Sequence, residues 1–240
     1  MKSQVKVMQA VILAGGLGTR LGDITKRLPK PMVPVAGKPY LEWQLAELRR
    51  QGITTIAILS GYLGEQIEEH FGDGSRFGLS IRYSREEVPQ GTGGGLRDAG
   101  SLLADEFLLV YGDSYLPIDY PSVLRRLDRD PAAVGVAVVY DNRESTTVPN
   151  NIAVDEAGYV TRYAKDAPQT GDLRYVEAGV LAFRKSILEL LPPGRPVSLE
   201  KDAFPTLIER HQLLAHVTGQ RFYDIGTPDR LAVIERLFAS

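Results

Sequence analysis

A strand near the start of the chain limits the choice of fold more than any other feature. Val5 to Leu13 is a nearly continuous apolar run, which is typical of a strand buried on both faces of a parallel sheet. Pro39 to Gln51 then has leucines at helical spacing, and Ile53 to Leu59 is a second apolar run. Parallel strands need long crossover connections, which are usually helices. This order of strand, helix and strand therefore predicts an α/β fold.

The same alternation continues along the chain and becomes richer in strands in the second half. Ala157-Gly158 separates two short strand patterns and predicts a hairpin. We expect one domain over 1–240, with a mostly parallel mixed sheet flanked by helices and a smaller, partly antiparallel lobe. A ligand crevice is expected beyond the carboxyl ends of the strands. The other predicted helices cover 64–71, 93–103, 121–129, 185–191, 199–210 and 228–238, and the other predicted strands cover 79–83, 107–111, 134–140, 152–154, 159–163, 175–183 and 213–217.

The composition is that of an ordinary soluble globular protein, with 43% hydrophobic and 24% charged residues among 240. A net charge of −2 provides no basic field for nucleic acid, so any anion site has to be local. The absence of cysteine excludes disulfides and thiolate chemistry. No apolar stretch approaches the roughly 20 residues that span a bilayer, and residues 1–10 lack a signal peptide's cleavage site. We therefore expect a cytoplasmic protein that binds neither membranes nor nucleic acid.

The glycine loop Gly15-Gly16-Leu17-Gly18 directly follows the first strand. Glycines allow positive φ angles and let backbone N–H groups approach an anion closely. Two common phosphate-binding loops do not fit, because a P-loop requires Gly-Lys-Ser/Thr after the glycines and the dinucleotide fingerprint requires a glycine where Leu21 stands. The loop favours a polyanion such as a nucleoside triphosphate. The alternative is a plain glycine turn that faces solvent.

Four cations follow the glycines: Arg20, Lys26, Arg27 and Lys30. The segment that carries them also contains three prolines, Pro29, Pro31 and Pro34. Because a residue before proline is biased away from the helical region, we expect this segment to be extended and not helical. Lys30 lies between two of the prolines, so a stiff backbone can direct it at a phosphate. Lys26 and Arg27 are expected to face solvent.

Several motifs resemble those of the sugar-1-phosphate nucleotidyltransferases. "LAGGLGTRL" together with "LPKPMVPVAGKP" resembles the family signature. Further motifs match in the same order along the chain: "VPQGTGG" at 88–94, "VYGDS" at 110–114, "EAGV" at 177–180 and "YDIGTPDRL" at 223–231. The resemblance covers nearly the whole chain. It implies a Rossmann-like sheet, with a nucleotide-binding part roughly over 1–115 plus 218–240 and a sugar-binding part roughly over 140–217.

The resemblance also implies the site residues. Arg20, Lys30 and Asp113 are the implied catalytic residues, and Asp113 and Asp224 the implied ligands of one Mg²⁺ ion. The implied nucleotide-binding residues are Leu13, Ala14, Gly15, Gly16, Gly18, Thr19, Glu86, Gly91 and Thr92. The implied sugar-phosphate-binding residues are Gly112, Asn151, Lys165, Glu177 and Gly179.

The two aspartates also have a rationale of their own. Asp113 follows an apolar strand and Gly112, so its carboxylate is placed where a strand ends and can ligate Mg²⁺ beside phosphates. Asp224 stands shortly before Gly226-Thr227-Pro228, where a helix is predicted to begin. Taken alone, Asp113 is equally compatible with a turn-forming role and Asp224 with a structural role near the helix.

The implied reaction is attack by a sugar 1-phosphate oxygen on the α-phosphorus of a nucleoside triphosphate, with pyrophosphate as the leaving group. It needs no general base, because a phosphate monoester with a second pKa of about 6 is already mostly ionised at pH 7. By the resemblance, Arg20 binds the β- and γ-phosphates, Lys30 the α-phosphoryl transition state and Lys165 the incoming phosphate. Two rival classes are a regulatory subunit that binds nucleotide sugars without turnover and a dehydrogenase, which Leu21 disfavours. A homo-oligomer is left open.

The sugar is a further expectation from the resemblance. "VPQGTGGGLRDA" and "LPKPMVPVAGKPYLEW" look most like the heptose 1-phosphate guanylyltransferases, which implies D-glycero-α-D-manno-heptose 1-phosphate as the acceptor and GTP as the donor. Mannose 1-phosphate is the nearest alternative, and UTP, dTTP or CTP are the alternative donors. The family's common "RYG" motif is replaced by Asn150-Asn151-Ile152, which leaves the sugar contacts there open.

The preferred nucleotide base is predicted from Glu86. Family members that use uridine or thymidine triphosphates usually have a glutamine five residues before the glycine that corresponds to Gly91, and Glu86 occupies that place here. A carboxylate offers only acceptors. Guanine presents two adjacent donors, N1–H and the exocyclic amine, so Glu86 can bind it through two charge-assisted hydrogen bonds. The alternative is that Glu86, beside Glu87, faces water.

Overall fold

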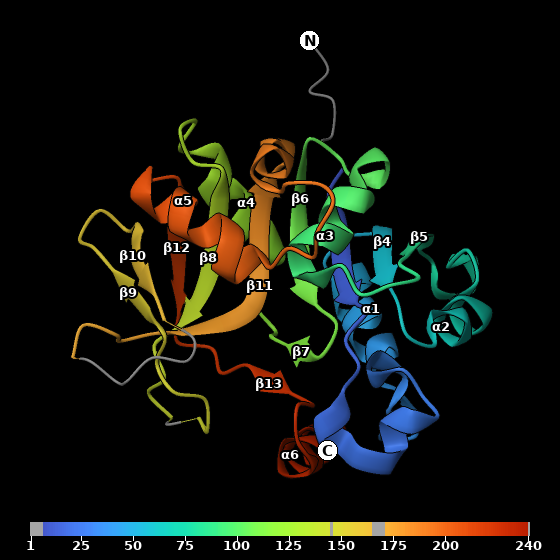
Figure 1. Ribbon diagram of the computed structural model, residues 1–240. Helices are drawn as coiled ribbons and strands as arrows, with labels where there is room; N and C mark the ends of the chain where they lie inside the picture. The colour runs from blue at the N-terminus through green and yellow to red at the C-terminus, as the bar shows by residue number, and fades with distance from the viewer. Residues whose placement is uncertain (1–6, 145, 165–170, 240) are drawn as a thin grey trace.

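The computed structural model describes residues 7–144, 146–164 and 171–239. Figure 1 shows a central sheet with helices packed on both of its faces. The strands of this sheet are β1 Gln9–Ala14, β4 Thr55–Ser60, β5 Ser80–Arg85, β6 Glu106–Tyr111, β8 Gly135–Tyr140, β11 Val176–Arg184 and β12 Leu213–Thr218. The α-helices are α1 Tyr40–Arg50, α2 Gly64–Phe71, α3 Gly91–Asp98, α4 Tyr120–Asp128, α5 Phe204–Glu209 and α6 Pro228–Ala239.

The sheet is mixed and mostly parallel, as the sequence predicts. Its strand order is β12-β8-β11-β6-β1-β4-β5. β1 pairs in parallel with both β4 and β6, and β4 pairs in parallel with β5. β11 is antiparallel to its neighbours β6 and β8, while β8 and β12 are parallel. The chain therefore leaves β1 toward β4 and β5 on one side and returns to β6 on the other, which makes the carboxyl end of β1 a topological switch point.

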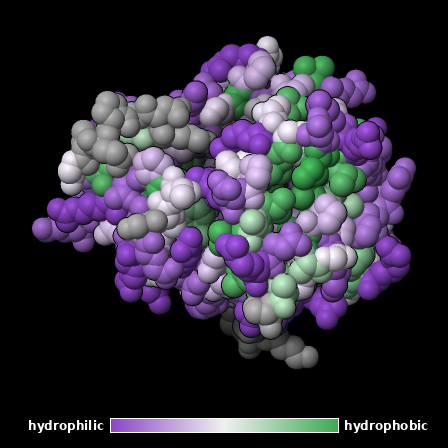
Figure 2. Space-filling view, turned by 90° about the horizontal axis from the view of Figure 1, so that it is seen from below, coloured by the Kyte–Doolittle hydropathy of each residue, from purple (hydrophilic) through white to green (hydrophobic). Residues whose placement is uncertain are grey.

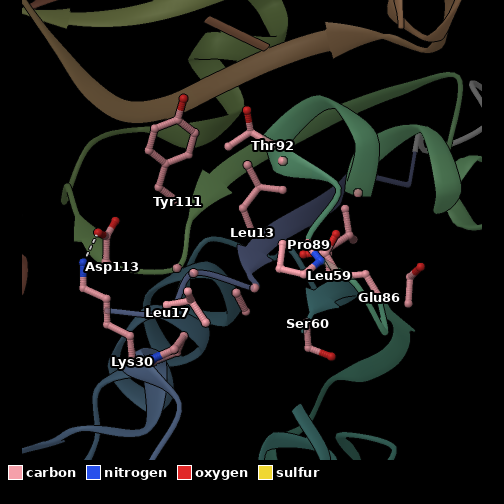
Figure 3. Close-up of a pocket in the computed structure, with 18 of the residues that line it drawn as sticks. Leu13, Leu17, Lys30, Leu59, Ser60, Glu86, Pro89, Thr92, Tyr111 and Asp113 are labelled. Atoms are coloured by element: carbon pink, nitrogen blue, oxygen red, sulfur yellow. Dashed lines mark hydrogen bonds and ion pairs between the residues drawn. The ribbon is translucent and has the colours of Figure 1, made fainter. Parts of the chain in front are cut away.

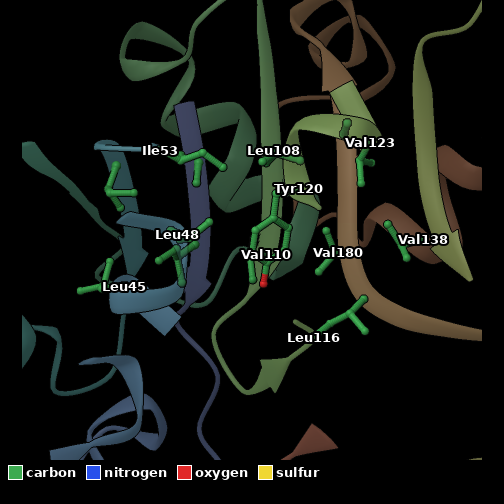
Figure 4. Close-up of a cluster of buried hydrophobic side chains, with 14 of the residues drawn as sticks. Leu45, Leu48, Ile53, Leu108, Val110, Leu116, Tyr120, Val123, Val138 and Val180 are labelled. Atoms are coloured by element: carbon green, nitrogen blue, oxygen red, sulfur yellow. The ribbon is translucent and has the colours of Figure 1, made fainter. Parts of the chain in front are cut away.

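The hydrophobic core lies on both faces of the sheet. Along β1, Ile12 belongs to the buried cluster that includes α1, α2 and α4, whereas Val11 belongs to the cluster that includes α3 and α5. Successive strand residues point to opposite faces, so a strand covered on both sides needs apolar residues at every position. Figure 4 shows part of the first cluster, with Leu45 and Leu48 of α1 beside Leu108 and other strand residues. The continuous apolar run at the start of the chain is explained by this double burial.

Three small antiparallel ribbons complete the described part of the fold. β9 Ile152–Val154 pairs with β10 Val160–Tyr163, which confirms the predicted hairpin. β2 Pro34–Val35 pairs with β3 Lys38–Pro39, and β7 Ser114–Tyr115 pairs with β13 Tyr223–Asp224. A further buried cluster, which includes Leu21, Val33 and Ile225, packs against α6. Among the described residues, no helix is both long and apolar enough to cross a bilayer.

Several predicted elements differ from those observed. The helix expected over 199–210 is a π-helical turn, Leu199–Ala203, followed by α5, and the helix expected over 185–191 is the 3₁₀ helix Lys185–Leu190. The helix expected over 93–103 is α3 followed by the 3₁₀ turn Gly100–Leu102. Of the expected strand from Val5, the first two residues lie outside the described part, and β1 begins at Gln9. These boundaries depend on tertiary contacts more than on local periodicity.

The segment after the glycine loop corrects a prediction. It was expected to be extended, but Thr19–Lys26 and Lys30–Met32 are 3₁₀ helices. Gly22, with φ 64°, breaks the first of them. Pro31 lies within the first turn of the second, where the N–H that proline lacks is not needed as a donor. Proline therefore excludes an α-helix here without enforcing an extended chain.

Candidate active site

A cavity of about 420 Å³ opens at the carboxyl ends of β1, β4 and β6, at the topological switch point. This edge of the sheet lies toward the bottom of Figure 1, and Figure 2 views the molecule from below, where patches of hydrophobic residues are framed by hydrophilic ones. Many of the predicted site residues line the cavity, namely Leu13, Ala14, Gly15, Gly16, Lys30, Glu86, Gly91, Thr92, Gly112 and Asp113. Sequence motifs some hundred residues apart therefore meet in one place.

The glycines of the first loop form one wall of the cavity. A methyl group on Gly15 would lie 2.9 Å from the Glu86 carboxylate, so the glycine leaves room for this side chain beside the loop. Gly112 follows the neighbouring strand β6 and also lies close to another chain segment. A methyl group on Gly112 would lie 2.6 Å from the carbonyl oxygen of Leu13. Gly18 (φ 63°) turns the chain into the 3₁₀ segment that begins with the exposed Thr19, and neither residue is part of the cavity lining.

Lys30 supplies a buried positive charge in the cavity. It is only 8% exposed, and its ammonium group forms an ion pair with the Asp113 carboxylate (Figure 3). A buried ammonium group is costly unless it is paired. The Asp113 carboxylate therefore offsets the cost of burying the Lys30 ammonium group. Lys26 and Arg27, predicted to face solvent, are both exposed.

Arg20 lies outside the cavity lining. It is exposed and sits next to Gly226, since a methyl group on Gly226 would come within 3.3 Å of an Arg20 guanidinium nitrogen. This places Arg20 beside the turn after Asp224. Its assignment to the β- and γ-phosphates stays a prediction.

The β7–β13 ribbon brings the two aspartates together. Asp224 pairs with Ser114, and the Ile225 N–H donates to the Asp113 carbonyl at 3.0 Å. One carboxylate oxygen of Asp224 accepts the Gly226 N–H at 2.7 Å, and Arg230 contacts both oxygens at 3.2 Å. Each carboxylate is thus next to a cation, Lys30 for Asp113 and Arg230 for Asp224.

These two carboxylates fit a Mg²⁺ site of the kind that binds phosphates. Among the described residues there is no group of three or more His, Cys, Asp or Glu side chains that could hold a metal ion by itself. Mg²⁺ is commonly bound by only one or two carboxylates, with water and substrate phosphates as the remaining ligands.

The buried hydroxyl of Tyr40 has no hydrogen-bond partner among the described residues. Burial raises its pKa most, and the charges of Asp113 and Asp224 raise it further.

Glu86 lies at the opposite end of the cavity from Asp113 (Figure 3). Its carboxylate accepts the Gln90 N–H at 2.9 Å, which fixes the start of α3. Burial raises the pKa of Glu86, while the Gln90 N–H lowers it and nearby Asp98 raises it. Glu87 is exposed and is not part of the lining. The cavity therefore has Glu86 at one end and the Lys30–Asp113 ion pair at the other.

Glu200 is a cavity residue that the sequence reasoning missed. It is 7% exposed and accepts hydrogen bonds from Tyr111, from Thr92 at 2.9 Å and from Ser198 at 2.7 Å. Burial, and then the charges of Glu177 and Glu200, hold the pKa of Tyr111 well above its usual range. Glu200 lies in the π-helical turn, a structure frequently found at functional sites. In the sequence it looks like an ordinary first-turn acid of the predicted helix, so no local signal distinguishes it.

Of the predicted sugar-phosphate-binding residues, Gly112 lines this cavity, whereas Asn151, Glu177 and Gly179 lie outside its lining. Asn151 accepts the Glu177 N–H at 2.9 Å, and Glu177 accepts the Gly179 N–H at 2.7 Å. Gly179 has φ 77°, and a methyl group there would lie 2.5 Å from Ser114 Cβ, so it packs against the β7 strand beside Asp113. Lys165 falls outside the described residues.

A second cavity borders strand β13 of the ribbon. Its volume is about 300 Å³, and it borders Asp224, Arg230 and the loop around Thr147. The Arg230 guanidinium also donates to the Thr147 hydroxyl at 2.9 Å. Asp224 is therefore both a residue of the β7–β13 ribbon and a lining residue of the second cavity.

The chain matches the Nucleotidyl transferase family over residues 9–239. It is 34% identical over 229 residues to a mannose-1-phosphate guanylyltransferase of Mycobacterium tuberculosis, covering 92% of this chain but only 62% of that protein. It is 31% identical over 229 residues to a D-glycero-alpha-D-manno-heptose 1-phosphate guanylyltransferase of Aneurinibacillus thermoaerophilus, covering 92% of this chain and 94% of that protein.

A solved structure provides a third comparison. The crystal structure of HddC from Yersinia pseudotuberculosis has a TM-score of 0.80 and 26% sequence identity. The similarity covers 96% of this chain and 99% of that chain. The same protein has also been solved in complex with GMP-PN, with a TM-score of 0.78 to this chain.

Proposed function

Because this chain belongs to the nucleotidyl transferase family, we propose that it transfers GMP from GTP to a sugar 1-phosphate, D-glycero-α-D-manno-heptose 1-phosphate, giving GDP-heptose and pyrophosphate. The observation that carries the proposal is the cavity at the switch point. It combines a glycine wall, the buried cation Lys30 and the carboxylate of Asp113. In the proposal, 1–115 with 218–240 binds the nucleotide and 140–217 the sugar. The reaction takes place in the cytoplasm.

The proposed chemistry requires positioning and charge neutralisation more than acid–base catalysis. A phosphate oxygen of the sugar 1-phosphate attacks the α-phosphorus, the bond to the β-phosphate oxygen breaks, and pyrophosphate leaves with the electron pair. Lys30 leaves Asp113 and binds the α-phosphoryl oxygens, which replace the carboxylate as its anionic partner. Arg20 reaches the β- and γ-phosphates from beside Gly226, and Lys165 binds the incoming phosphate.

Asp113 and Asp224 would hold the Mg²⁺ ion in this proposal. When bound, the ion would neutralise charge on the reacting phosphates. The exchange of partners by Lys30 frees the Asp113 carboxylate at the same step. Arg230 stays beside Asp224 and, with the Gly226 N–H, limits the directions in which that carboxylate can turn.

The base is assigned to the Glu86 end of the cavity. Guanine N1–H and its amine would donate to the Glu86 carboxylate, while the glycine face of α3, at Gly91 and Gly95, leaves room for the planar ring. Adenine presents an acceptor at N1 and would leave the carboxylate without a donor. The complex of HddC with GMP-PN supports a guanine nucleotide.

Mannose 1-phosphate is the second candidate acceptor. The mannose-1-phosphate guanylyltransferase of Mycobacterium tuberculosis has the higher identity to this chain, 34% against 31%. The heptose relative is favoured because the two chains match over nearly their whole lengths. A regulatory subunit without turnover is disfavoured, because Lys30 and both aspartates are present.

Pyrophosphate release tests the proposal directly. The protein is incubated with Mg²⁺ and each of GTP, UTP, dTTP, CTP and ATP, together with heptose 1-phosphate, mannose 1-phosphate or glucose 1-phosphate. We expect the highest kcat/KM with GTP and the heptose phosphate. A preference for mannose 1-phosphate would refute the heptose assignment, and binding without pyrophosphate release would favour the regulatory class.

A further inference from the structure

Helix α1 supports the turn that contains Asp113. Gln44 is only 3% exposed, and its amide nitrogen donates to the carbonyl of Tyr111 at 2.8 Å and also to the carbonyl of Ser114. These carbonyls are the two ends of the turn Tyr111–Ser114, which contains Gly112 and Asp113. Both acceptors are carbonyl oxygens, so only the NH₂ side of the Gln44 amide can face them.

The two hydrogen bonds from Gln44 restrain both ends of the turn, whose backbone would otherwise be freer to change conformation. Gly112 adds backbone freedom within the turn, and its N–H is held by the Leu13 carbonyl at 2.9 Å. On the far side, Ile225 donates to the Asp113 carbonyl. The Gln44 amide is the side-chain group that joins both ends of the turn. Without it, two carbonyls lose a donor, and the Asp113 side chain can change direction relative to Asp224.

A second polar group on the same face of α1 lies near the aspartates. Tyr40 precedes Gln44 by four residues, about one helical turn. The buried Tyr40 hydroxyl and the side-chain amide oxygen of Gln44 both lack a hydrogen-bond partner among the described residues. Unpaired polar atoms in a core are rare and call for an explanation. Burial raises the pKa of the Tyr40 hydroxyl most, and the hydroxyl is close enough to Asp113 and Asp224 for their charges to raise its pKa further.

We infer that Gln44 is a positioning residue for a divalent cation site formed by Asp113 and Asp224, acting through the Tyr111–Ser114 turn and not by contact with substrate. This rests on the part of the proposed function that assigns a cation to the two aspartates. Partners in the outer shell of metal sites hold the ligands in a productive orientation, and their loss typically costs roughly 10–100-fold in metal affinity.

Helix α1 also offers a matched control. Gln51 directly follows α1, and its amide nitrogen donates to the carbonyl of Ile118 at 2.7 Å, while its oxygen accepts the Tyr120 N–H at 2.8 Å. Gln51 therefore supports the connection from β7 to α4, as Gln44 supports the turn from β6 to β7. The Gln51 contacts do not include the Asp113 turn. Gln44→Met and Gln51→Met each remove an amide that bonds to backbone, but only Gln44→Met affects that turn.

The test is a Mn²⁺ titration followed by electron paramagnetic resonance, with and without GTP, on wild type, Gln44→Met, Gln51→Met and Asp113→Asn. We expect Gln44→Met to weaken Mn²⁺ binding roughly 10–100-fold, Gln51→Met to leave it unchanged, and Asp113→Asn to abolish it. Circular dichroism checks folding. If Gln44→Met does not fold, Gln44→Glu, which keeps the shape but replaces the donating nitrogen with oxygen, is used with the same expected loss.

Equal Mn²⁺ affinity in Gln44→Met and wild type, or an equal loss in Gln51→Met, would overturn the inference. So would a wild type that binds no Mn²⁺ at the aspartates. Pyrophosphate release by wild type, measured in parallel, separates this result from the proposed function: its absence refutes the proposed reaction, whereas turnover with an unaffected Gln44→Met variant refutes only the positioning role.

Discussion

At the scale of single residues, Lys30 has the most demanding environment in the cavity. Its ammonium group is nearly buried and depends on Asp113 as a counter-ion. A bound phosphate can take over that role, because it also carries negative charge and accepts charge-assisted hydrogen bonds. Lys30 is therefore suited to exchange partners during a reaction that develops charge on the α-phosphoryl group.

Lys30→Ala should lower turnover far more than nucleotide affinity, because Lys30 is assigned to the transition state. Loss of one such charged group typically costs on the order of 10²–10³ in rate. The measurement is kcat from pyrophosphate release together with a Kd for GTP. Lys26→Ala, which removes an exposed lysine paired with Asp23, is the control and should leave both values unchanged. Equal losses in kcat and affinity for Lys30→Ala would contradict the assignment.

Glu86→Gln should weaken GTP use and improve UTP or dTTP use. An amide offers one donor and one acceptor, which suits the pyrimidine N3–H and its flanking carbonyl and no longer suits two guanine donors. By analogy with base-edge contacts, the change is worth roughly 1–3 kcal/mol, about 5- to 150-fold in the ratio of kcat/KM values. Glu87→Gln is the matched control. A shift in the ratio with Glu87→Gln but not with Glu86→Gln would show that the wrong acid was assigned.

The preference for GTP should also depend on pH. Burial raises the pKa of Glu86 above its ordinary value of 4.5. Acidification therefore protonates Glu86 at a higher pH than an exposed glutamate, and the neutral acid can no longer accept from both guanine donors. The GTP:UTP ratio of kcat/KM should be highest above this raised pKa and fall as the pH drops through it. The ratio in Glu86→Gln should not change over the same range.

At the scale of elements, the β7–β13 ribbon determines the geometry of the two aspartates. Each of its strands has only two residues, yet the ribbon joins the end of β6 to a segment more than a hundred residues later. Gly179 of β11 packs against Ser114 at a distance that no side chain would allow. The sheet thus fixes the position of the ribbon. Two strands of two residues each would not be stable without this support.

Asp113→Asn and Asp224→Asn should each abolish Mg²⁺-dependent pyrophosphate release while the protein stays folded. An amide keeps the shape of the side chain but is a far weaker ligand for a hard cation. Circular dichroism and a Mg²⁺ titration of the activity provide the measurement. Arg230→Gln, which removes the cation beside Asp224, is a useful comparison because it keeps both carboxylates. Near-normal activity of either aspartate variant at low Mg²⁺ would rule out the two-aspartate site.

At the scale of the whole molecule, the last helix returns to the first third of the chain. α6 follows Asp224 and packs on a buried cluster that contains Leu21 and Ile225. Trp43 of α1 stacks on Phe238 of α6, with ring centroids 4.3 Å apart and planes within 9°. Phe238 also contacts Tyr115 of β7, so α6 packs against both α1 and the β7–β13 ribbon.

Phe238→Ala should lower the free energy of unfolding by roughly 1–3 kcal/mol, less than the ~3–5 kcal/mol of a fully buried phenylalanine, because Phe238 is only partly buried. Trp43 is the sole tryptophan of the chain, so urea unfolding can be followed by its fluorescence. The emission of the folded variant should also change, since the stacked partner is lost. Leu237→Ala, at an exposed position of the same helix, should have little effect. Equal effects of the two variants would contradict a specific role for the stacked pair.

The sequence alone predicted the fold class and most of its elements. The apolar run of β1, the helical spacing of α1 and the helix over 64–71 were all correctly predicted. Burial on both faces imposes a continuous apolar run on a strand, and burial on one face imposes a period of 3.6 residues on a helix, so a local window contains both signals. The sequence also predicted ten of the residues that line the cavity. Glycines and charges at the ends of strands are local signals, and parallel strands bring their carboxyl ends to one edge.

The way in which those residues come together depends on tertiary packing. A strand of two residues has no period, so the β7–β13 pairing of Asp224 with Ser114, the neighbour of Asp113, leaves no local trace. Glu200 and Gln44 look like ordinary helix residues until packing turns them toward Thr92 and the Asp113 turn. The 3₁₀ path of the segment with Lys30 likewise depends on contacts that its prolines do not specify. Residue type and period are properties of the local chain, whereas partners far apart in sequence are selected by the packing of the whole.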